Sequence, residues 1–555
     1  MFTKKKESLS GFDNNTSGNI AIINQPFLAA GLEKSAETSS GNGSLKYSTT
    51  GYAELDQFGK TSTYRKPRTF DEISRDMSIL WAENQLNAVK FTIYLRLISR
   101  KVMMFDGATT EAPQRGAELK HEAQMRMFWI LQKSSETFYK NLPVFISAGS
   151  WKDIFVLMKY DLEYHGWEEK VLDFNRVVNL IISGLNDPNH VDLIKKYLPS
   201  LKSKSNCTTV GSQANNLIAK YICNKLFGQS ENMGKTYREY RKLKSSGTAH
   251  EWQQLISQKK HNLIDFSKIH GRALSQLVKS KYLKNQGLSE KYNEWITKPE
   301  TVGVKYTGFV HELFKDCILG NSNSVETINK QFKTLVEKAG PSQTNLIVVR
   351  DTSASMGSYA TGLDISCFDV AKSLALYFSE FLSGQFANSY IEFNSSAKMC
   401  TWKGSTPVER WVNDKAYYNG STNFQSVIEL FCNLRSKGIS ESDFPSGILC
   451  ISDGMFNPAE LDETNVESAR RKLTNAGFSE QYVRDFVIIL WNLGNDYYGS
   501  KKSGQQFETY GNVSNTYHFS GYSASVIAML REGIKTPMEL FDACMNQELL
   551  QKVEV

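Results

Sequence analysis

The chain has 555 residues, of which 41% are hydrophobic, and a formal net charge of +7. This length provides room for roughly two to four domains with substantial cores. No run of eighteen apolar residues is present and no apolar segment follows the basic start at Met1–Lys6, so we expect neither a membrane-spanning helix nor a secretory signal. The eight cysteines lack the C-x-x-C and metal-finger spacings, which predicts reduced thiols and a cytoplasmic location.

The charge is unevenly distributed along the chain. Residues 190–300 contain about twenty Lys and Arg against about eight Asp and Glu, a net charge of roughly +12. Residues 341–530 contain about fourteen Lys and Arg against about nineteen Asp and Glu, a net charge of roughly −5. We therefore expect a multidomain protein in which a basic module and an acidic module share one chain.

The first half is predicted to be helical after an irregular start. Residues 1–60 are rich in Ser, Gly, Asn and Thr, which indicates a flexible N-terminal arm or a tail without function. Thr69 and Glu72 then have the spacing of a helix capping box, and apolar residues recur beyond them at helical spacing. We expect residues 61–340 to form an all-α module, a helical solenoid or an irregular bundle, whose further helices include 117–138, 150–164 and 171–185.

The most basic stretch of this module is 235–244, in which Tyr237 and Tyr240 lie between Lys and Arg residues. Such a helix surface can contact phosphates and stack on bases, as RNA binding requires, or it can be a solvated face. The first interpretation is favoured by further basic residues, namely Lys195, Lys196, Lys202, Lys204, Lys220, Lys225, Lys259, Lys260 and Arg272. The candidate RNA-binding residues are Lys235, Arg238, Arg241, Lys242 and Lys244.

After a boundary at Gly340–Ser342 the pattern changes to alternating strands and helices. This alternation predicts that residues 341–555 form an α/β domain with a doubly wound, mostly parallel sheet. The expected strands are 346–349, 390–393, 447–451 and 485–491, and the expected helices are 363–382, 423–434, 465–475 and a closing helix at 537–553.

Three polar loops are expected at one edge of this sheet. The first, Asp351–Ser355, follows a strand and carries a carboxylate and two hydroxyls on alternate residues, while later loops carry Thr422 and Asp453. Ligand sites of open α/β sheets lie beyond the carboxyl ends of the strands, and hard oxygen donors suit a divalent cation. We therefore expect a Mg²⁺ site with the candidate ligands Asp351, Ser353, Ser355, Thr422 and Asp453.

Catalytic motifs are not evident in the sequence. The eight histidines are scattered, and the G-x-S-x-G, H-E-x-x-H and phosphate-binding Gly-rich motifs are missing. Asp351 with Ser353 could be a hydrolytic pair, but a serine nucleophile needs a general base that the sequence does not provide. We expect a protein that is not an enzyme, with a hydrolase as the minor alternative.

The order D-x-S-x-S, loop threonine and S-D-G resembles the metal-ion-dependent adhesion site of the von Willebrand factor A domain. The resemblance implies that Asp351, Ser353, Ser355 and Thr422 gather around Mg²⁺ and that Asp453 helps directly or through water. It also implies an open coordination position that takes an Asp or Glu of a protein partner.

The layout of the whole chain resembles that of the TROVE-domain proteins, the Ro ribonucleoprotein type with its bacterial and phage relatives. In them a basic helical module precedes an A domain. The resemblance implies a ring or horseshoe of HEAT-like helical repeats, closed by the A domain, that binds small structured or misfolded RNA. The similar stretches are 42–58, 86–96, 149–153, 237–238, 491–493 and 520–523.

Two functions follow as hypotheses. In the first, the protein binds RNA through its basic helices while the A domain holds Mg²⁺ and a protein or other second ligand. In the second, it is a phage structural or assembly protein whose Mg²⁺ site recruits an acidic protein partner, without physiological RNA. We expect a monomer in either case, located in the cytoplasm of the host if phage-encoded or carried in a virion.

Overall fold

The computed structural model divides the chain into two compact units. The helical unit contains residues 67–251 and 544–555, and the α/β unit contains residues 252–543 with the described part of 33–66. The division therefore falls at Glu251, inside the segment expected to be one helical module, and not at residue 340. The described residues are 37–39, 45–47, 50–61, 67–228, 233–246, 250–269, 271, 273, 274, 277, 287–298, 301, 304, 306, 308–318, 325–339, 345–360, 362–382, 386–461, 463–494, 515–520 and 536–555.

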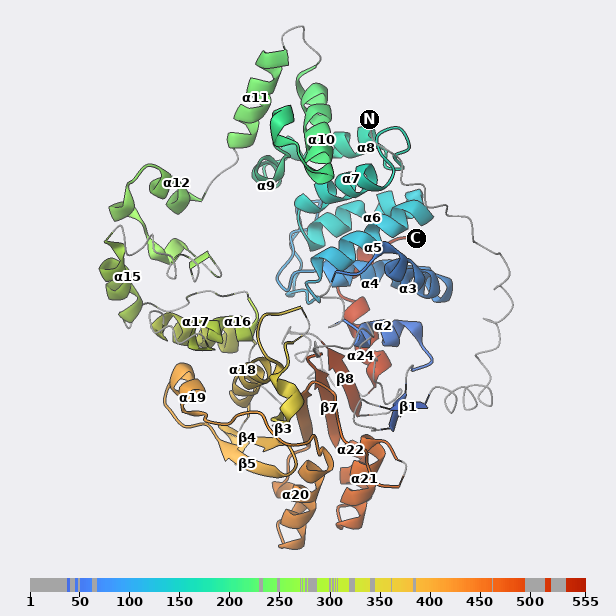
Figure 1. Ribbon diagram of the computed structural model, residues 1–555, viewed down its shortest axis with the longest axis vertical. Helices are drawn as coiled ribbons and strands as arrows, with labels where there is room; N and C mark the ends of the chain where they lie inside the picture. The colour runs from blue at the N-terminus through green and yellow to red at the C-terminus, as the bar shows by residue number, and fades with distance from the viewer. Residues whose placement is uncertain are drawn as a thin grey trace. The chain divides into compact units, whose positions relative to one another are not determined.

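Every regular element among the described residues of the helical unit is a helix (Figure 1). The first begins at the predicted capping box, because Thr69 Oγ1 accepts the Glu72 N–H while the Glu72 carboxylate accepts the Thr69 N–H. The segment 117–138, expected as one helix, is broken at Ser134, which caps the following helix by accepting the Thr137 N–H. The helices are α3 Phe70–Glu83, α4 Gln85–Arg96, α5 Lys120–Lys133, α6 Ser135–Ala148, α7 Lys152–Tyr164, α8 Phe174–Leu185, α9 Val191–Tyr197, α10 Val210–Phe227 and α11 Met233–Ser245.

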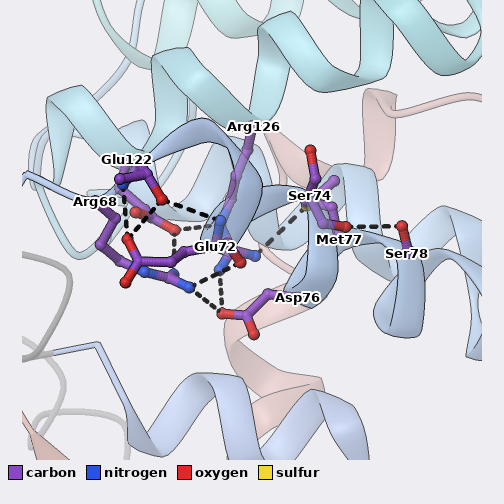
Figure 2. Close-up of polar contacts among 9 residues, drawn as sticks. Arg68, Glu72, Ser74, Asp76, Met77, Ser78, Glu122 and Arg126 are labelled. Carbon is purple, nitrogen blue, oxygen red and sulfur yellow. Dashed lines mark hydrogen bonds and ion pairs between the residues drawn. The ribbon is translucent and has the colours of Figure 1, made fainter. Parts of the chain in front are cut away.

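A buried charge network joins α3 to α5 in the helical unit (Figure 2). Arg126 Nε and Arg68 Nη1 lie 2.8 and 3.0 Å from the same oxygen of Glu122, and Arg68 also pairs with Asp76 at 2.7 Å. The side chains of Arg126 and Glu122 are 0% and 1% exposed. Buried guanidinium groups depend on such carboxylates, because an uncompensated charge inside a protein is strongly unfavourable.

The last residues of the chain belong to the helical unit. The expected closing helix 537–553 is interrupted: α24 covers Pro537–Met545, and a short 3₁₀ turn covers Leu550–Lys552. Asn141 on α6 donates its side-chain amide to the Glu554 carbonyl and accepts the Glu554 N–H at 3.0 Å. Both backbone groups of Glu554 are therefore fixed by one side chain of α6.

A six-stranded sheet forms the centre of the α/β unit, with the strand order β5-β4-β3-β6-β7-β8. Only β5 pairs antiparallel, so the mostly parallel sheet is confirmed. All residues of β3, β4 and β6 are buried, as expected for parallel strands covered on both faces. The strands are β3 Leu346–Asp351, β4 Ser389–Phe393, β5 Ala397–Thr401, β6 Gly447–Ser452, β7 Val487–Asn492 and β8 Thr516–Ser520.

Helices cover both faces of this sheet (Figure 1). On one face, α20 and α21 pack with Val349 and Leu490 into a shared hydrophobic core. The residues next to these along the strands, Arg350 and Trp491, contact the rings of Phe368 and Phe378 on α18, which covers the other face. The helices are α18 Cys367–Ser379, α19 Pro407–Asn413, α20 Gln425–Ser436, α21 Asn465–Asn475 and α22 Glu480–Asp485.

Several segments expected in other modules also belong to the α/β unit. Helix α16 packs on α18 and α19, where Phe314 stacks on Trp411 with ring centroids 4.6 Å apart. Within the expected N-terminal arm, Phe58 of a short helix packs edge-on against Phe541. Residues 1–36 of that arm lie outside the described residues. The elements concerned are β1 Glu37–Ser39, β2 Leu45–Tyr47, α2 Ala53–Gly59, α12 Glu251–Ser257, α15 Leu288–Thr297, α16 Val310–Ile318 and α17 Val325–Ala339.

Two expectations about the whole chain can be compared with the structure. The eight cysteines are thiols rather than disulfides, and half of them are buried. Among the helices of the described residues, none combines the length and the apolar character that crossing a bilayer requires.

Candidate metal centre

The first candidate loop starts at the last residue of β3. Asp351 is fully buried, and its Oδ1 accepts a 2.8 Å hydrogen bond from the Ser353 N–H, which fixes the turn at the end of the strand. The hydroxyls of Ser353 and Ser355 lie 3.1 Å apart. A carboxylate and two hydroxyls thus lie together at the carboxyl end of the central strand.

Hydrogen bonds join this loop to the two other candidate loops. The Ala354 N–H donates to the carbonyl of Gly420 at 3.1 Å, and Gly420 has a φ of +73°, which glycine adopts without strain. The Thr422 carbonyl accepts the N–H of Asn457, in the segment after β6, at 2.9 Å. The structure therefore brings together the three loops that carry Asp351, Thr422 and Asp453.

The candidate ligands are largely removed from water. Thr422 is 1% and Asp453 is 5% exposed, whereas Ser355 is only partly buried. Burial and, next, the negative charge of Asp453 raise the pKa of Asp351 to about 7, although hydrogen bonds from Ser452 and Ser353 oppose the shift. Two carboxylates that share a buried site are unfavourable unless a proton or a cation compensates their charge.

The donor set fits a hard divalent cation. It consists of two carboxylates and three hydroxyls, and such oxygen donors suit Mg²⁺. Asp351 Oδ1 accepts the Ser353 N–H and Oδ2 accepts the Ser452 hydroxyl, and an ionised carboxylate offers about four lone-pair sites in all. Among the residues that the structure describes, no cluster of three or more His, Cys, Asp or Glu side chains is arranged for a metal ion.

Two residues of this centre are absent from the sequence-based set. Ser452 donates its hydroxyl to Asp351 Oδ2 at 2.5 Å, and the Gly454 N–H donates to Ser452 Oγ at 3.0 Å. Asn457 accepts the Thr422 N–H through its side chain at 3.4 Å. The position of Ser452 at the end of the strand beside β3 could have indicated its role, whereas no pattern in the sequence points to Asn457.

The candidate RNA-binding residues all lie on α11 of the helical unit. Lys235, Arg238, Arg241 and Lys242 are exposed. Lys244 is different, because it is partly buried, it donates to a backbone carbonyl, and burial lowers the pKa of its ammonium group. Four of the five side chains can therefore meet a polyanion from solvent.

The expected alternation of basic and aromatic side chains on α11 is only partly present. Tyr240 is fully buried, and its hydroxyl donates to the Pro199 carbonyl at 2.9 Å, so it cannot stack on a base. Tyr237 is half-buried. The side chain of Tyr240 is therefore part of the core of the helical unit and connects α11 to the backbone at Pro199.

The additional basic residues are divided between the two units. Lys195, Lys196, Lys202, Lys220 and Lys225 belong to the helical unit with α11, whereas Lys259 and Lys260 belong to the α/β unit. The side chain of Lys204 and all of Arg272 lie outside the described residues.

Comparison with known proteins gives one family match. A family model described as a domain of unknown function, DUF7788, matches residues 345–551. The matched residues begin immediately before β3 and include all six strands of the sheet and all five candidate metal ligands. No curated protein matches the chain.

Proposed function

We propose that this protein is a non-enzymatic binding protein whose α/β unit holds Mg²⁺ and, through it, an acidic group of a partner. The observation that carries this proposal is the pair of carboxylates, Asp351 and Asp453, that lie buried together beside three hydroxyls. A bound Mg²⁺ would compensate their charge and be held by Asp351, Ser353, Ser355 and Thr422, with Asp453 in direct or water-mediated contact. This arrangement is the one implied by the resemblance to the von Willebrand factor A domain.

Access to the site supports ligand binding by the metal rather than a purely structural role. Ser355 is partly buried, and Ala354, Gly420 and Ser421 on the joined loops are exposed. The five residues offer five oxygen ligands, and Asp453 can act through a water molecule. A coordination position would therefore be left for an outside ligand. A carboxylate of a protein partner matches that position in charge and hardness.

The test is capture of partners by immobilised protein in Mg²⁺, with Asp351→Asn as the matched variant. Asparagine keeps the size of the side chain and removes the charge that a cation requires. The proposal predicts proteins retained by the wild type in Mg²⁺ and lost both in EDTA and with Asp351→Asn. Retention that is equal in all three conditions would exclude the metal from partner binding.

We further propose RNA binding by the helical unit as a second function, of the Ro and TROVE type, with its helices forming HEAT-like repeats. The exposed cations Lys235, Arg238, Arg241 and Lys242 on one short helix favour it. Phosphate contacts by such residues release counterions, so the affinity should fall steeply with salt. The ligands expected from the resemblance are small structured or misfolded RNAs.

A phage structural or assembly protein without physiological RNA is the alternative. The absorbance ratio at 260 and 280 nm, measured on protein purified without nuclease, separates the two proposals. Co-purified nucleic acid that is lost when Lys235, Arg238 and Arg241 are reversed to Glu supports RNA binding. Protein free of nucleic acid that still captures an acidic partner through Mg²⁺ supports the alternative.

A further inference from the structure

A cavity of the α/β unit opens beside the candidate metal centre, and none of the five candidate ligands lines it. Its volume is about 630 Å³, within the usual range for small-molecule sites. Its walls come from β4, from β5 and the two residues after it, and from the end of α19 with the segment 414–419 that follows. Thr352 of the first candidate loop lines one side. In Figure 1, β4 and β5 form the edge of the sheet on the side of α19.

The alternation of side chains along the edge strands creates this cavity. Ile391 and Phe393 of β4 point into the hydrophobic core shared with α20. The residues that alternate with them along the strand, Tyr390 and Glu392, line the cavity on the opposite face. Their cross-strand partners Cys400 and Lys398 on β5 line it too. One face of β4 therefore packs in the hydrophobic core, whereas its other face and β5 form a polar and aromatic wall of the cavity.

Positive charge is in excess around this wall. Arg350, fully buried beneath it, pairs with Asp414 at 2.5 Å and with Glu392 at 3.0 Å. Lys398 pairs with Glu392 at 2.5 Å, and Lys372 lies 3.7 Å from Asp414. Three cationic side chains are thus paired with two carboxylates, Glu392 and Asp414. The negative charges of both carboxylates are therefore balanced, and one positive charge remains.

Two further cations, Lys403 and Lys415, line the opening and are exposed. The cavity is therefore electropositive, although residues 341–530 as a whole carry a net charge of roughly −5. An anionic ligand fits this local excess, because Lys side chains at the opening can approach it without leaving a buried carboxylate unpaired.

The remaining walls suit a flat, hydrogen-bonding ring. Tyr417 lines the cavity with its side chain 69% exposed, so its ring is available for stacking. The amide of Asn394 donates to Asn419 Oδ1 and that of Asn413 donates to the Lys403 carbonyl, both at 2.9 Å. Each of these two amides has a second N–H, and with the hydroxyl of Thr401 they provide hydrogen-bonding groups around the cavity. We propose that this cavity binds a nucleotide, with the base against Tyr417 and a phosphate at Lys403 and Lys415.

The proposal is independent of the Mg²⁺ site and of α11. The nucleotide is either free or the end of a nucleic acid strand, since both present the same base and phosphate. An acidic peptide would satisfy the lysines but would leave the aromatic face and the amides unused. For that reason a nucleotide fits the lining better than a peptide does.

The experiment is calorimetric titration of the full-length protein in EDTA with AMP and UMP, with adenosine, with inorganic phosphate and with a tetraglutamate peptide. EDTA removes any contribution of a bound cation. We expect a monophosphate to bind at least about tenfold more tightly than either the nucleoside or phosphate alone, because base and phosphate are held together. Absence of nucleotide binding, or binding of the peptide in its place, would overturn the proposal.

Two variants and a matched control locate the binding. Lys403→Glu with Lys415→Glu, and separately Tyr417→Ala, should each weaken nucleotide binding by about tenfold or more. Lys437→Glu, an exposed lysine at the end of α20 that does not line the cavity, should leave it unchanged. Equal binding by all of these variants would place the nucleotide elsewhere and refute the assignment. Thermal melting of each variant checks that it is folded.

A short oligoribonucleotide distinguishes the two sources of nucleotide. It is tested on a chain in which Lys235, Arg238 and Arg241 are reversed to Glu, so that α11 does not contribute. Binding at least about tenfold tighter than that of the mononucleotide identifies a strand end as the ligand, and equal binding identifies a free nucleotide. Asp351→Asn should retain nucleotide binding, so failure of the metal proposal and failure of this one give different results.

Discussion

Ser452 places its hydroxyl 2.5 Å from Asp351 Oδ2, across the adjacent strands β6 and β3. Since the Gly454 N–H donates to the same hydroxyl oxygen, the hydroxyl proton points to the carboxylate. Asp351 is thereby oriented from one side by Ser452 and from the other by the Ser353 N–H. This pair of hydrogen bonds sets the position of the central carboxylate.

The first prediction concerns this orientation. Ser452→Ala should lower the affinity for Mg²⁺ by about 10- to 100-fold, the usual effect of removing a group that orients a metal ligand. Titration of Mg²⁺ by calorimetry measures it. Ser446→Ala, which removes an exposed hydroxyl bonded to the Asn345 carbonyl, is the control and should have no effect. An unchanged affinity in Ser452→Ala would show that Asp351 needs no such support.

The second prediction concerns pH. The pKa of Asp351 is about 7 in the folded protein and 3.8 as its ordinary value. Between these values the folded form holds one more proton than the unfolded chain, so without a cation the free energy of unfolding should fall as the pH rises from about 4 to about 7. Because Mg²⁺ must displace that proton, its affinity should rise by about tenfold per pH unit in this range and level off above it. Denaturation in EDTA and Mg²⁺ titration across the range test both trends. The stability of Asp351→Asn should lack the decrease contributed by this carboxyl, and the variant should not bind Mg²⁺ at any pH in the range.

The third prediction concerns the charge network of the helical unit. Glu122→Ala leaves Arg126 buried with a weaker partner, Asp76, whose oxygen lies 3.9 Å away. The free energy of unfolding should fall by about 3–5 kcal/mol, as when one partner of a buried ion pair is removed. Glu136→Ala, which removes the partner of Lys140 in an exposed pair, should cost less than about 1 kcal/mol. Similar reductions in both variants, measured by denaturant unfolding, would contradict the importance of burial.

The fourth prediction separates the residues of α11. Reversing Lys235, Arg238 and Arg241 to Glu should weaken RNA binding and flatten the slope of log affinity against log salt, by about 0.7 for each phosphate of a single strand that is no longer neutralised. Lys244→Ala should leave the slope unchanged and lower stability instead, because the ammonium group of Lys244 is bonded to the Leu198 carbonyl. Binding across a salt series, with thermal melting alongside, measures both. A slope that Lys244→Ala changes as much as the triple variant does would show that Lys244 turns outward to reach RNA.

The sequence was most informative where one residue type determines local structure. The buried strands appear in it as continuous apolar runs, so β3, β4, β6 and β7 were expected within a few residues of their positions. Neither edge strand, β5 or β8, was expected. In β5, Lys398 and Thr401 line the cavity and break the apolar pattern. The three loops of the candidate metal centre, which hydrogen bonds bring together, were chosen from oxygen-bearing residues at strand ends and from their order along the chain.

Tertiary packing accounts for most of what the sequence could not predict. The helices α16 and α17 are amphipathic like those of the helical unit, and only their packing against α18 and α19 assigns them to the α/β unit. The burial of Tyr240 and the engagement of Lys244 depend on the carbonyls of Pro199 and Leu198, more than forty residues earlier. The cavity beside β4 likewise requires α19 and its following segment, which no local pattern places there.

The central claim is that Asp351 anchors a divalent cation. The most direct test is a Mg²⁺ titration of the wild type and of Asp351→Asn. It is made at about pH 8, because Asp351 is ionised in the folded protein at that pH. The account predicts saturable binding of one ion per chain in the wild type, loss of that binding in Asp351→Asn, and a rise in melting temperature on adding Mg²⁺ to the wild type alone. Wild-type protein that binds no ion, or a variant that binds Mg²⁺ as tightly as the wild type does, would contradict it.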